Sequence, residues 1–164
     1  MFSNDLICDI LIYIDIHINE PIANEKMCEL FHYDKFYMMK KFKKEIGYTI
    51  HDYQNRIRIY QSLADFKTSA SILKIALAHG FHSLEYFSEI FTKIIGINPT
   101  KYRKFVQNPF TLEKEDREKL RMNLSQLSDL KNDITLYKQK RKPKTAPVQK
   151  LSLFCADGIK KGGW

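Results

Sequence analysis

The chain has 164 residues, of which 44% are hydrophobic and 28% charged, and this balance excludes a wholly disordered protein. Its length allows one ordinary domain or two small ones and excludes a large enzyme. The net charge of +8 favours an acidic partner, but residues 1–106 carry 14 Lys and Arg against 12 Asp and Glu, so most of the excess lies in residues 107–164.

The first part of the chain is predicted to form helices separated by turns. Apolar residues at three- and four-residue steps indicate an amphipathic helix over about residues 4–17, and a short helix is expected over about 23–31. A turn at residues 32–34 follows, with Asp34 as the candidate N-cap of a helix that ends before Gly47.

A longer helix over residues 49–63, with one apolar stripe, is interpreted as a rigid connector. The chain then repeats the earlier pattern, with a short helix over residues 71–79, a turn at Gly80, and a second helix from its cap Ser83 to about Gly96. The sequences FKKEIG and FTKIIG occur 49 residues apart in the two parts, which indicates a duplication. No stretch here alternates as a strand does, so the sequence predicts an all-α fold.

The last third of the chain has a different character. Residues from 111 to about 138 are predicted to form one amphipathic helix, because their apolar members recur at helical steps: Leu120, Leu124, Leu127, Leu130, Ile134 and Tyr137. The apolar stripe of this helix must pack on something. Residues 138–150 hold six basic residues and no acid, which is typical of a basic linker. The expected organisation is a first subdomain over 1–48, a connector over 49–64, a second subdomain over 65–107, and a helix with a basic tail over 108–164.

A set of spaced motifs between Ser71 and Arg103 resembles the signature of the AraC/XylS family of bacterial transcription regulators. The motifs are I-x-x-I-A, G-F, a small polar cap, Y-F, F-x-x-x-x-G and P-x-x-Y-R. Residues 22–63 are similar to the family's first unit, and the resemblance covers roughly residues 5–105. Because the chain begins almost at this module, it is most similar to the compact MarA/SoxS/Rob subgroup.

The resemblance implies two homeodomain-like helix-turn-helix subdomains joined by the long connector helix. Each subdomain would insert a recognition helix into successive major-groove segments of double-stranded DNA. It further implies a sequence-specific transcription regulator of the bacterial cytoplasm that acts with RNA polymerase. The sequence departs from the family's usual pattern at His32, where glycine is common, and at Glu89, where compact relatives carry a DNA-contacting arginine.

Transferred by position, the resemblance directs Phe36, Met39 and Lys40 of the first recognition helix toward the major groove and Lys43 and Lys44 toward phosphates. Lysine can donate to guanine O6 and N7, whereas phenylalanine and methionine offer only apolar contacts. The alternative interpretation is that these lysines form an ordinary solvated face.

In the second recognition helix, Ser83 is expected to cap the helix and to bring its first backbone amides to a phosphate. Glu89 is either a cytosine reader or the partner of Lys93 at i+4, and the ion pair is the favoured of the two. The positions on or near the groove are Leu84, Glu85, Tyr86, Ser88 and Glu89.

Catalytic and metal chemistry is not predicted. The three cysteines form no C-x-x-C pattern, the histidines lack ligand spacing, and no phosphate-binding loop or nucleophile motif is present. We therefore expect no enzyme activity, cofactor, metal, signal peptide or membrane span. A competing function is a protein-interaction module with a decayed DNA surface, which Glu85 and Glu89 favour, and the C-terminal helix could bind a partner or a second copy.

Overall fold

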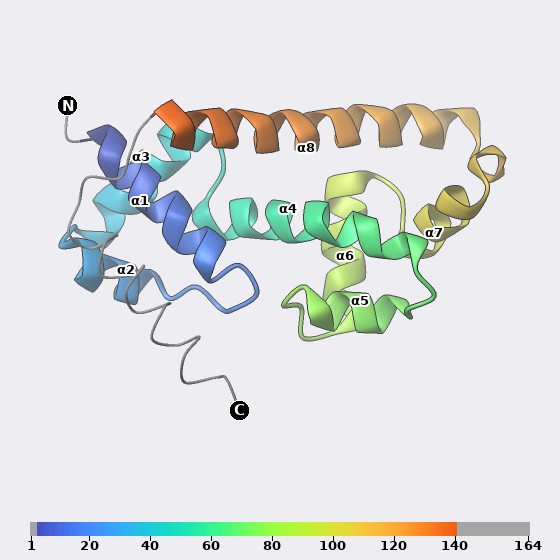
Figure 1. Ribbon diagram of the computed structural model, residues 1–164, viewed down its shortest axis with the longest axis horizontal. Coiled ribbons are helices and arrows are strands. Elements are labelled where there is room, and N and C mark those ends of the chain that lie inside the picture. Colours follow the sequence, from blue (N-terminus) through green and yellow to red (C-terminus); the bar gives the residue numbers. More distant parts are fainter. Residues whose placement is uncertain (1–2, 141–164) are drawn as a thin grey trace. The chain divides into compact units, whose positions relative to one another are not determined.

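The structure is a computed structural model that describes residues 3–140, and every regular element in that range is helical, as Figure 1 shows. The all-α prediction is confirmed. The described chain divides into two compact units. Unit 1 comprises residues 3–17, 22–50 and 134–140, and unit 2 comprises residues 18–21 and 51–133. The predicted basic linker beyond residue 140 and the last fourteen residues lie outside the described range.

Unit 1 contains the first three helices, α1 (Ser3–Ile16), α2 (Asn24–Phe31) and α3 (Lys35–Ile46). Their apolar stripes meet in one core, in which the largest fully buried side chains are Ile7, Ile10, Leu11, Ile14, Met27, Met38 and Phe42. This core positions α3 and leaves its opposite face in solvent. The amphipathic pattern read from the sequence therefore identified the buried face of α1.

The turn between α2 and α3 has the geometry of a helix-turn-helix corner. His32 adopts a left-handed conformation with φ of 58°, and its backbone N–H donates to the carbonyl of Cys28. Glycine is usually favoured in this conformation because a Cβ is strained there. Asp34 then caps α3, since its carboxylate accepts a hydrogen bond of 3.0 Å from the Tyr37 N–H, which confirms the predicted cap.

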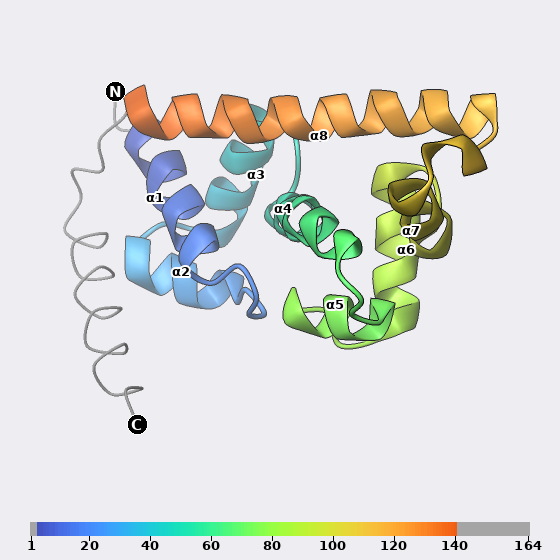
Figure 2. The same ribbon diagram turned by 45° about the vertical axis from the view of Figure 1, so that its right-hand side comes forward.

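Unit 2 is built around α4 (Ile50–Ser62), of which residues from His51 onward belong to this unit. The predicted helix over residues 49–63 is confirmed with one correction, because Leu63 begins a 3-10 helix, η1 (Leu63–Lys67). The helices that follow are α5 (Ile72–Ala78), α6 (Leu84–Ile95), α7 (Pro99–Gln107), the 3-10 helix η2 (Pro109–Thr111) and α8 (Lys114–Lys140). Figure 2 shows α5, α6 and α7 close together in this unit.

The core of unit 2 is rich in aromatic rings. Phe66 of η1 packs against Phe91 and Tyr102 at centroid distances of 5.2 and 5.0 Å, and Phe87 lies 5.6 Å from Phe91. The core predicted from the sequence for this unit is confirmed. Its predicted members are Ile75, Ala76, Phe81, Phe87, Ile90, Phe91 and Ile94. All of them are buried except Ile90, which is partly buried and packs against the cluster.

Helix α8 uses its predicted leucine stripe for packing. Leu120 and Leu127 are buried in the core of unit 2, and Ile134 is buried among the residues of unit 1. The side-chain amide of Asn123 donates to the Ile95 carbonyl at 2.9 Å, which satisfies an otherwise open acceptor at the end of α6. This helix is predicted to pack on the module or on a partner chain, and the burial of Leu120 and Leu127 in the core of unit 2 agrees with the first alternative.

Candidate nucleic-acid interface

Helix α3 presents a basic and aromatic face to solvent. Phe36, Lys40 and Lys43 lie at i, i+4 and i+7 on this face, while Met38 and Phe42 on the opposite side are fully buried. Phe36 is 80% exposed, which is unusual for so large an apolar side chain and is typical of a contact surface. The basic residues of the last turn also lie where they favourably oppose the negative end of the helix dipole.

Four side chains of α3 line an open hollow of about 260 Å3: Tyr37, Lys40, Lys41 and Lys44. The ammonium of Lys41 lies 5.7 Å from the centre of the Tyr37 ring, a cation–π distance. Tyr37 and Lys41 were not predicted from the sequence as site residues, although their i, i+4 spacing was visible there. Three ammonium groups around one hollow suit an anion such as a phosphate.

Met39 has a different environment from the other predicted residues of α3. Its side chain is half-buried, and its sulfur lies 3.9 Å from the Asn24 amide of α2. The side chain thus contacts the preceding helix as well as solvent. The residues that α3 presents most openly are Phe36, Lys40, Lys43 and Lys44.

Helix α6 begins at a well-formed cap. The Ser83 hydroxyl accepts a hydrogen bond of 3.1 Å from the Tyr86 N–H, as predicted. Leu84, Glu85 and Glu89 are exposed and Ser88 is partly exposed, whereas Phe87 on the inner side is fully buried. The outward face of α6 is therefore accessible, and it carries two acids rather than the lysines of α3.

Glu89 and Lys93 of α6 are the two residues for which an i, i+4 ion pair is predicted as one of two alternatives. Both side chains are exposed, and no ion pair joins them in the described structure. An exposed i, i+4 pair contributes only a few tenths of a kcal/mol, which is too little to hold two long side chains against solvent. The Glu89 carboxylate is left available to an external donor.

Tyr86 is held by two residues of α4. Its hydroxyl lies 3.2 Å from the Asn55 amide nitrogen and 3.2 Å from Nε2 of His51. Neither residue was selected from the sequence, because partners 31 and 35 positions away leave no local pattern. Tyr86 therefore belongs to a polar cluster with His51 and Asn55 as well as to the surface of α6.

Arg58 of α4 holds the segment of residues 18–21, which also belongs to unit 2. Arg58 donates from Nε to the Ile18 carbonyl at 2.6 Å and from a terminal nitrogen to the Glu20 carbonyl at 2.8 Å. Its guanidinium also lies 5.6 Å from the Phe81 ring, and desolvation lowers the pKa of Arg58 from its usual value. The arginine stays charged, since its ordinary pKa lies far above neutrality.

Within residues 3–140 no group of three or more His, Cys, Asp or Glu side chains could hold a metal ion. No helix in that range is long and apolar enough to cross a membrane.

Comparison with known proteins agrees with this geometry. A family model described as a helix-turn-helix domain matches residues 27–104, a span that includes both helix-turn-helix corners. The HTH-type transcriptional activator AarP of Providencia stuartii is 26% identical over 103 residues, which cover 62% of this chain and 76% of AarP. Residues 27–104 therefore form a helix-turn-helix domain of the AraC type. Relatives that match this part of the chain are named as transcriptional regulators.

Solved structures of the AraC-type family share the fold. The C-terminal domain of AraT, a response regulator from Geobacillus stearothermophilus, is 25% identical with a TM-score of 0.56 and covers 60% of this chain and 84% of that domain. An AraC-type transcriptional regulator from Chromobacterium violaceum is 23% identical with a TM-score of 0.56, covers 63% and 94% of the two chains, and supports the fold alone.

The lengths of the AraC-type relatives differ. The uncharacterized HTH-type transcriptional regulator YbfP of Bacillus subtilis is 32% identical over 105 residues, which cover 63% of this chain, and the chain spans only 35% of its length. The matched region is therefore the helix-turn-helix module, which occurs in both short and long proteins of the family.

Proposed function

We propose that this chain is a transcription regulator that binds double-stranded DNA by inserting α3 and α6 into successive major-groove segments. The observation that carries the proposal is a capped, solvent-facing second helix in each of two helix-turn-helix corners, both within the residues that match the helix-turn-helix domain. Relatives named as transcriptional regulators support it, and none of them supports the alternative of a protein-interaction module with a decayed DNA surface.

The two helices would contribute in different ways. The lysines of α3 supply donors for phosphates and for guanine, so this helix adds both affinity and base readout. Glu85 and Glu89 of α6 cannot bind phosphates, but a carboxylate accepts a hydrogen bond from the N4 amino group of cytosine. We expect the half-site read by α6 to contain a cytosine opposite Glu89, because that carboxylate has no ion pair with Lys93.

The test of the proposal is the salt dependence of DNA binding. Duplexes are selected from a random pool by the full-length chain, and binding is measured by fluorescence anisotropy over a salt series. Affinity should fall as salt rises, because lysine contacts release condensed counterions. Replacing both Lys43 and Lys44 by Ala should weaken binding to every duplex and make the slope shallower by almost one for each phosphate that is no longer neutralised. Affinity that does not change with salt would contradict groove docking.

Two further variants separate base readout from charge. Lys40→Ala should also reduce discrimination at one or two base pairs, by about 1–3 kcal/mol. Glu89→Gln should change the preference at one base pair of the other half-site while leaving the salt slope unchanged. Lys119→Ala is the matched control, because this lysine lies on α8 and is already paired with Glu115 at 3.1 Å.

The proposal extends to partners and location. We expect the chain to work in the bacterial cytoplasm, where the DNA lies, with RNA polymerase as its protein partner. Besides DNA and RNA polymerase, the proposal includes one further interaction, in which α8 binds either another protein or a second copy of the chain. No enzyme activity is expected, since positioning of two helices on DNA needs none.

A further inference from the structure

The polar cluster of His51, Asn55 and Tyr86 runs from the interior of unit 2 to its surface. Asn55 is 3% exposed and lies on the buried side of α4, whereas His51 and Tyr86 are both exposed. The Asn55 amide nitrogen lies 3.2 Å from Tyr86 Oη, which in turn lies 3.2 Å from His51 Nε2. The chain of hydrogen bonds therefore ends on an imidazole in the first turn of α4.

The chemistry of the three groups gives this chain a direction. An amide nitrogen only donates, so Tyr86 Oη accepts from Asn55, and the single proton of the tyrosine hydroxyl is available to His51 Nε2. The Asn55 amide also lies 3.5 Å from Nε2, which again requires an acceptor there. A neutral imidazole that accepts at Nε2 carries its proton on Nδ1.

The Nδ1–H group has no partner among the residues that the structure describes, where the hydrogen bonds of His51 involve Nε2 alone. The acid next to it in the chain, Asp52, contacts Arg56 instead, with Oδ2 3.6 Å from Nε. His51 therefore presents one outward donor that the fold itself does not use.

The location of this donor indicates its acceptor. Tyr86 belongs to the first turn of α6, and the N-terminal residues of a recognition helix are those that meet DNA in helix-turn-helix proteins. A donor next to that turn faces the wall of the groove, which is lined by phosphates. Between a half and two thirds of protein–DNA hydrogen bonds are made to phosphate and sugar, in many cases by uncharged side chains.

We propose that His51 donates its Nδ1–H to a backbone phosphate beside the groove that α6 enters, with Tyr86 and Asn55 fixing the tautomer. This inference rests on the proposed DNA binding. The contact is uncharged, so it adds affinity for every duplex without releasing a counterion. Tyr86 acts here as a positioning residue for His51 rather than as a reader of bases.

The tautomer is tested on the full-length chain without DNA. Long-range 1H–15N correlation spectra distinguish an imidazole that is protonated on Nδ1 from one that is protonated on Nε2. The wild-type chain should have His51 in the Nδ1–H form, and Tyr86→Phe, which removes the donor to Nε2, should yield a mixture. A wild-type His51 protonated on Nε2 would overturn the proposal.

The phosphate contact is tested with the duplex selected by the wild-type chain. His51→Ala should weaken binding about fivefold, as expected for one uncharged hydrogen bond, and leave the salt slope unchanged. Lys43→Ala serves as the charged reference, with a slope reduced by about 0.9. Gln61→Ala, an exposed position further along α4, is the matched control and should bind as the wild type does.

Two binding results would contradict the contact. Unchanged affinity of His51→Ala would exclude it, and a slope change as large as that of Lys43→Ala would make it a charged contact rather than an uncharged one. If the wild-type chain selects no duplex at all, the proposed function is contradicted, and the phosphate contact is contradicted with it. This holds even if His51 is found in the Nδ1–H form.

Discussion

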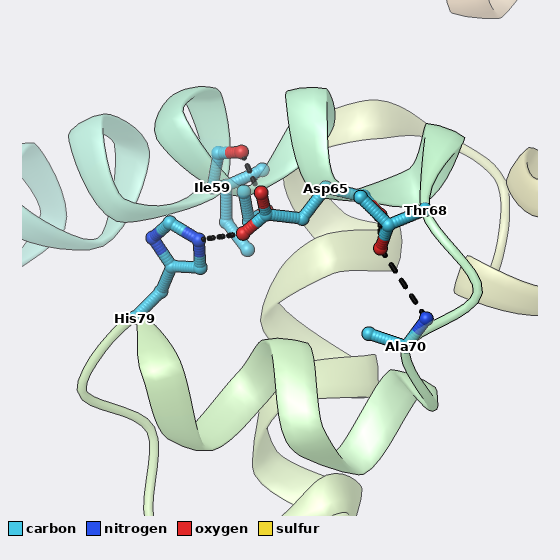
Figure 3. Close-up of polar contacts among 6 residues, drawn as sticks. Ile59, Asp65, Thr68, Ala70 and His79 are labelled. Atoms are coloured by element: carbon cyan, nitrogen blue, oxygen red, sulfur yellow. Dashed lines mark hydrogen bonds and ion pairs between the residues drawn. The ribbon is translucent and has the colours of Figure 1, made fainter.

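The carboxylate of Asp65 lies 2.7 Å from Nε2 of His79, which joins η1 to the last residue before the turn of the second helix-turn-helix corner (Figure 3). The imidazole is mostly buried, with 14% of its side chain exposed, and its other nitrogen has no hydrogen-bond partner among the described residues. The hydrogen bond with Asp65 therefore holds this ring against η1, the 3-10 helix that follows α4.

We predict that this hydrogen bond contributes about 1 kcal/mol to the free energy of unfolding, a typical value for a partly exposed pair. The measurement is a double-mutant cycle by urea denaturation with Asp65→Ala, His79→Ala and the double variant. The double variant should lose less free energy of unfolding than the sum of the losses of the two single variants. Strictly additive effects would show that the two residues stabilise the unit independently.

Of the three glycines in the described part of the chain, Gly80 should tolerate substitution least. Its φ is +81°, and a Cβ there would lie 2.6 Å from the backbone oxygen of Asn19. Gly80→Ala combines left-handed strain with a clash against backbone, so we expect a loss of about 2 kcal/mol or more. Gly47 is the control, because its φ is +90° but no described atom outside its own chain neighbourhood would lie within 4 Å of an added Cβ. Gly47→Ala should cost only the strain, about 1 kcal/mol. Equal losses in thermal unfolding would contradict the clash.

Much of the fold could be predicted because its signals are local. The predicted caps Asp34 and Ser83 each accept a hydrogen bond from a backbone N–H three residues on, which is a fixed spacing in the sequence. The apolar stripes likewise repeat every three or four residues. Such short-range relationships depend on helix geometry alone, so they are visible without a structure.

The parts of the candidate site that the sequence did not reveal depend on distant contacts. Tyr86 has an exposed position on a recognition helix, and only the fold shows that residues of α4 hold its hydroxyl. The half-burial of Met39 against Asn24 and the missing ion pair of Glu89 also follow from side-chain packing and solvent competition. Helical spacing limits which contacts can form and does not decide which ones do.

Acid should weaken unit 1 through the ion pair of Glu25 and Lys35, whose Oε1 and Nζ atoms are 2.7 Å apart. The hydrogen bond from Lys35 lowers the pKa of the Glu25 carboxyl below its ordinary value in the folded chain. The folded state therefore binds this proton less tightly than the unfolded state does. The stabilisation is present above the unfolded pKa and is lost as pH falls through the folded pKa.

The measurement compares the melting temperature of the wild type with that of Glu25→Gln over a pH series. The wild type should melt at the higher temperature at neutral pH, and the two curves should converge in acid, where Glu25 is protonated. High salt should reduce the difference, since both side chains are exposed. A difference that persists unchanged into acid would show that Glu25 stabilises the unit by something other than its charge.

Helix α8 should prove to be part of the core of unit 2 and not an appendage. Leu127 is 2% exposed within the aromatic cluster, so Leu127→Ala leaves a cavity and should lower the free energy of unfolding by about 2–5 kcal/mol. Leu136, on the same helix, is 50% exposed, and Leu136→Ala should cost less than about 0.5 kcal/mol. The pair is matched because leucine and alanine both favour helices, so helix propensity changes little and equally at the two positions. Chemical denaturation followed by circular dichroism measures both. If Leu127→Ala were as mild as Leu136→Ala, the stripe of α8 would not be needed by the helix-turn-helix module, and the helix would be free to serve a partner instead.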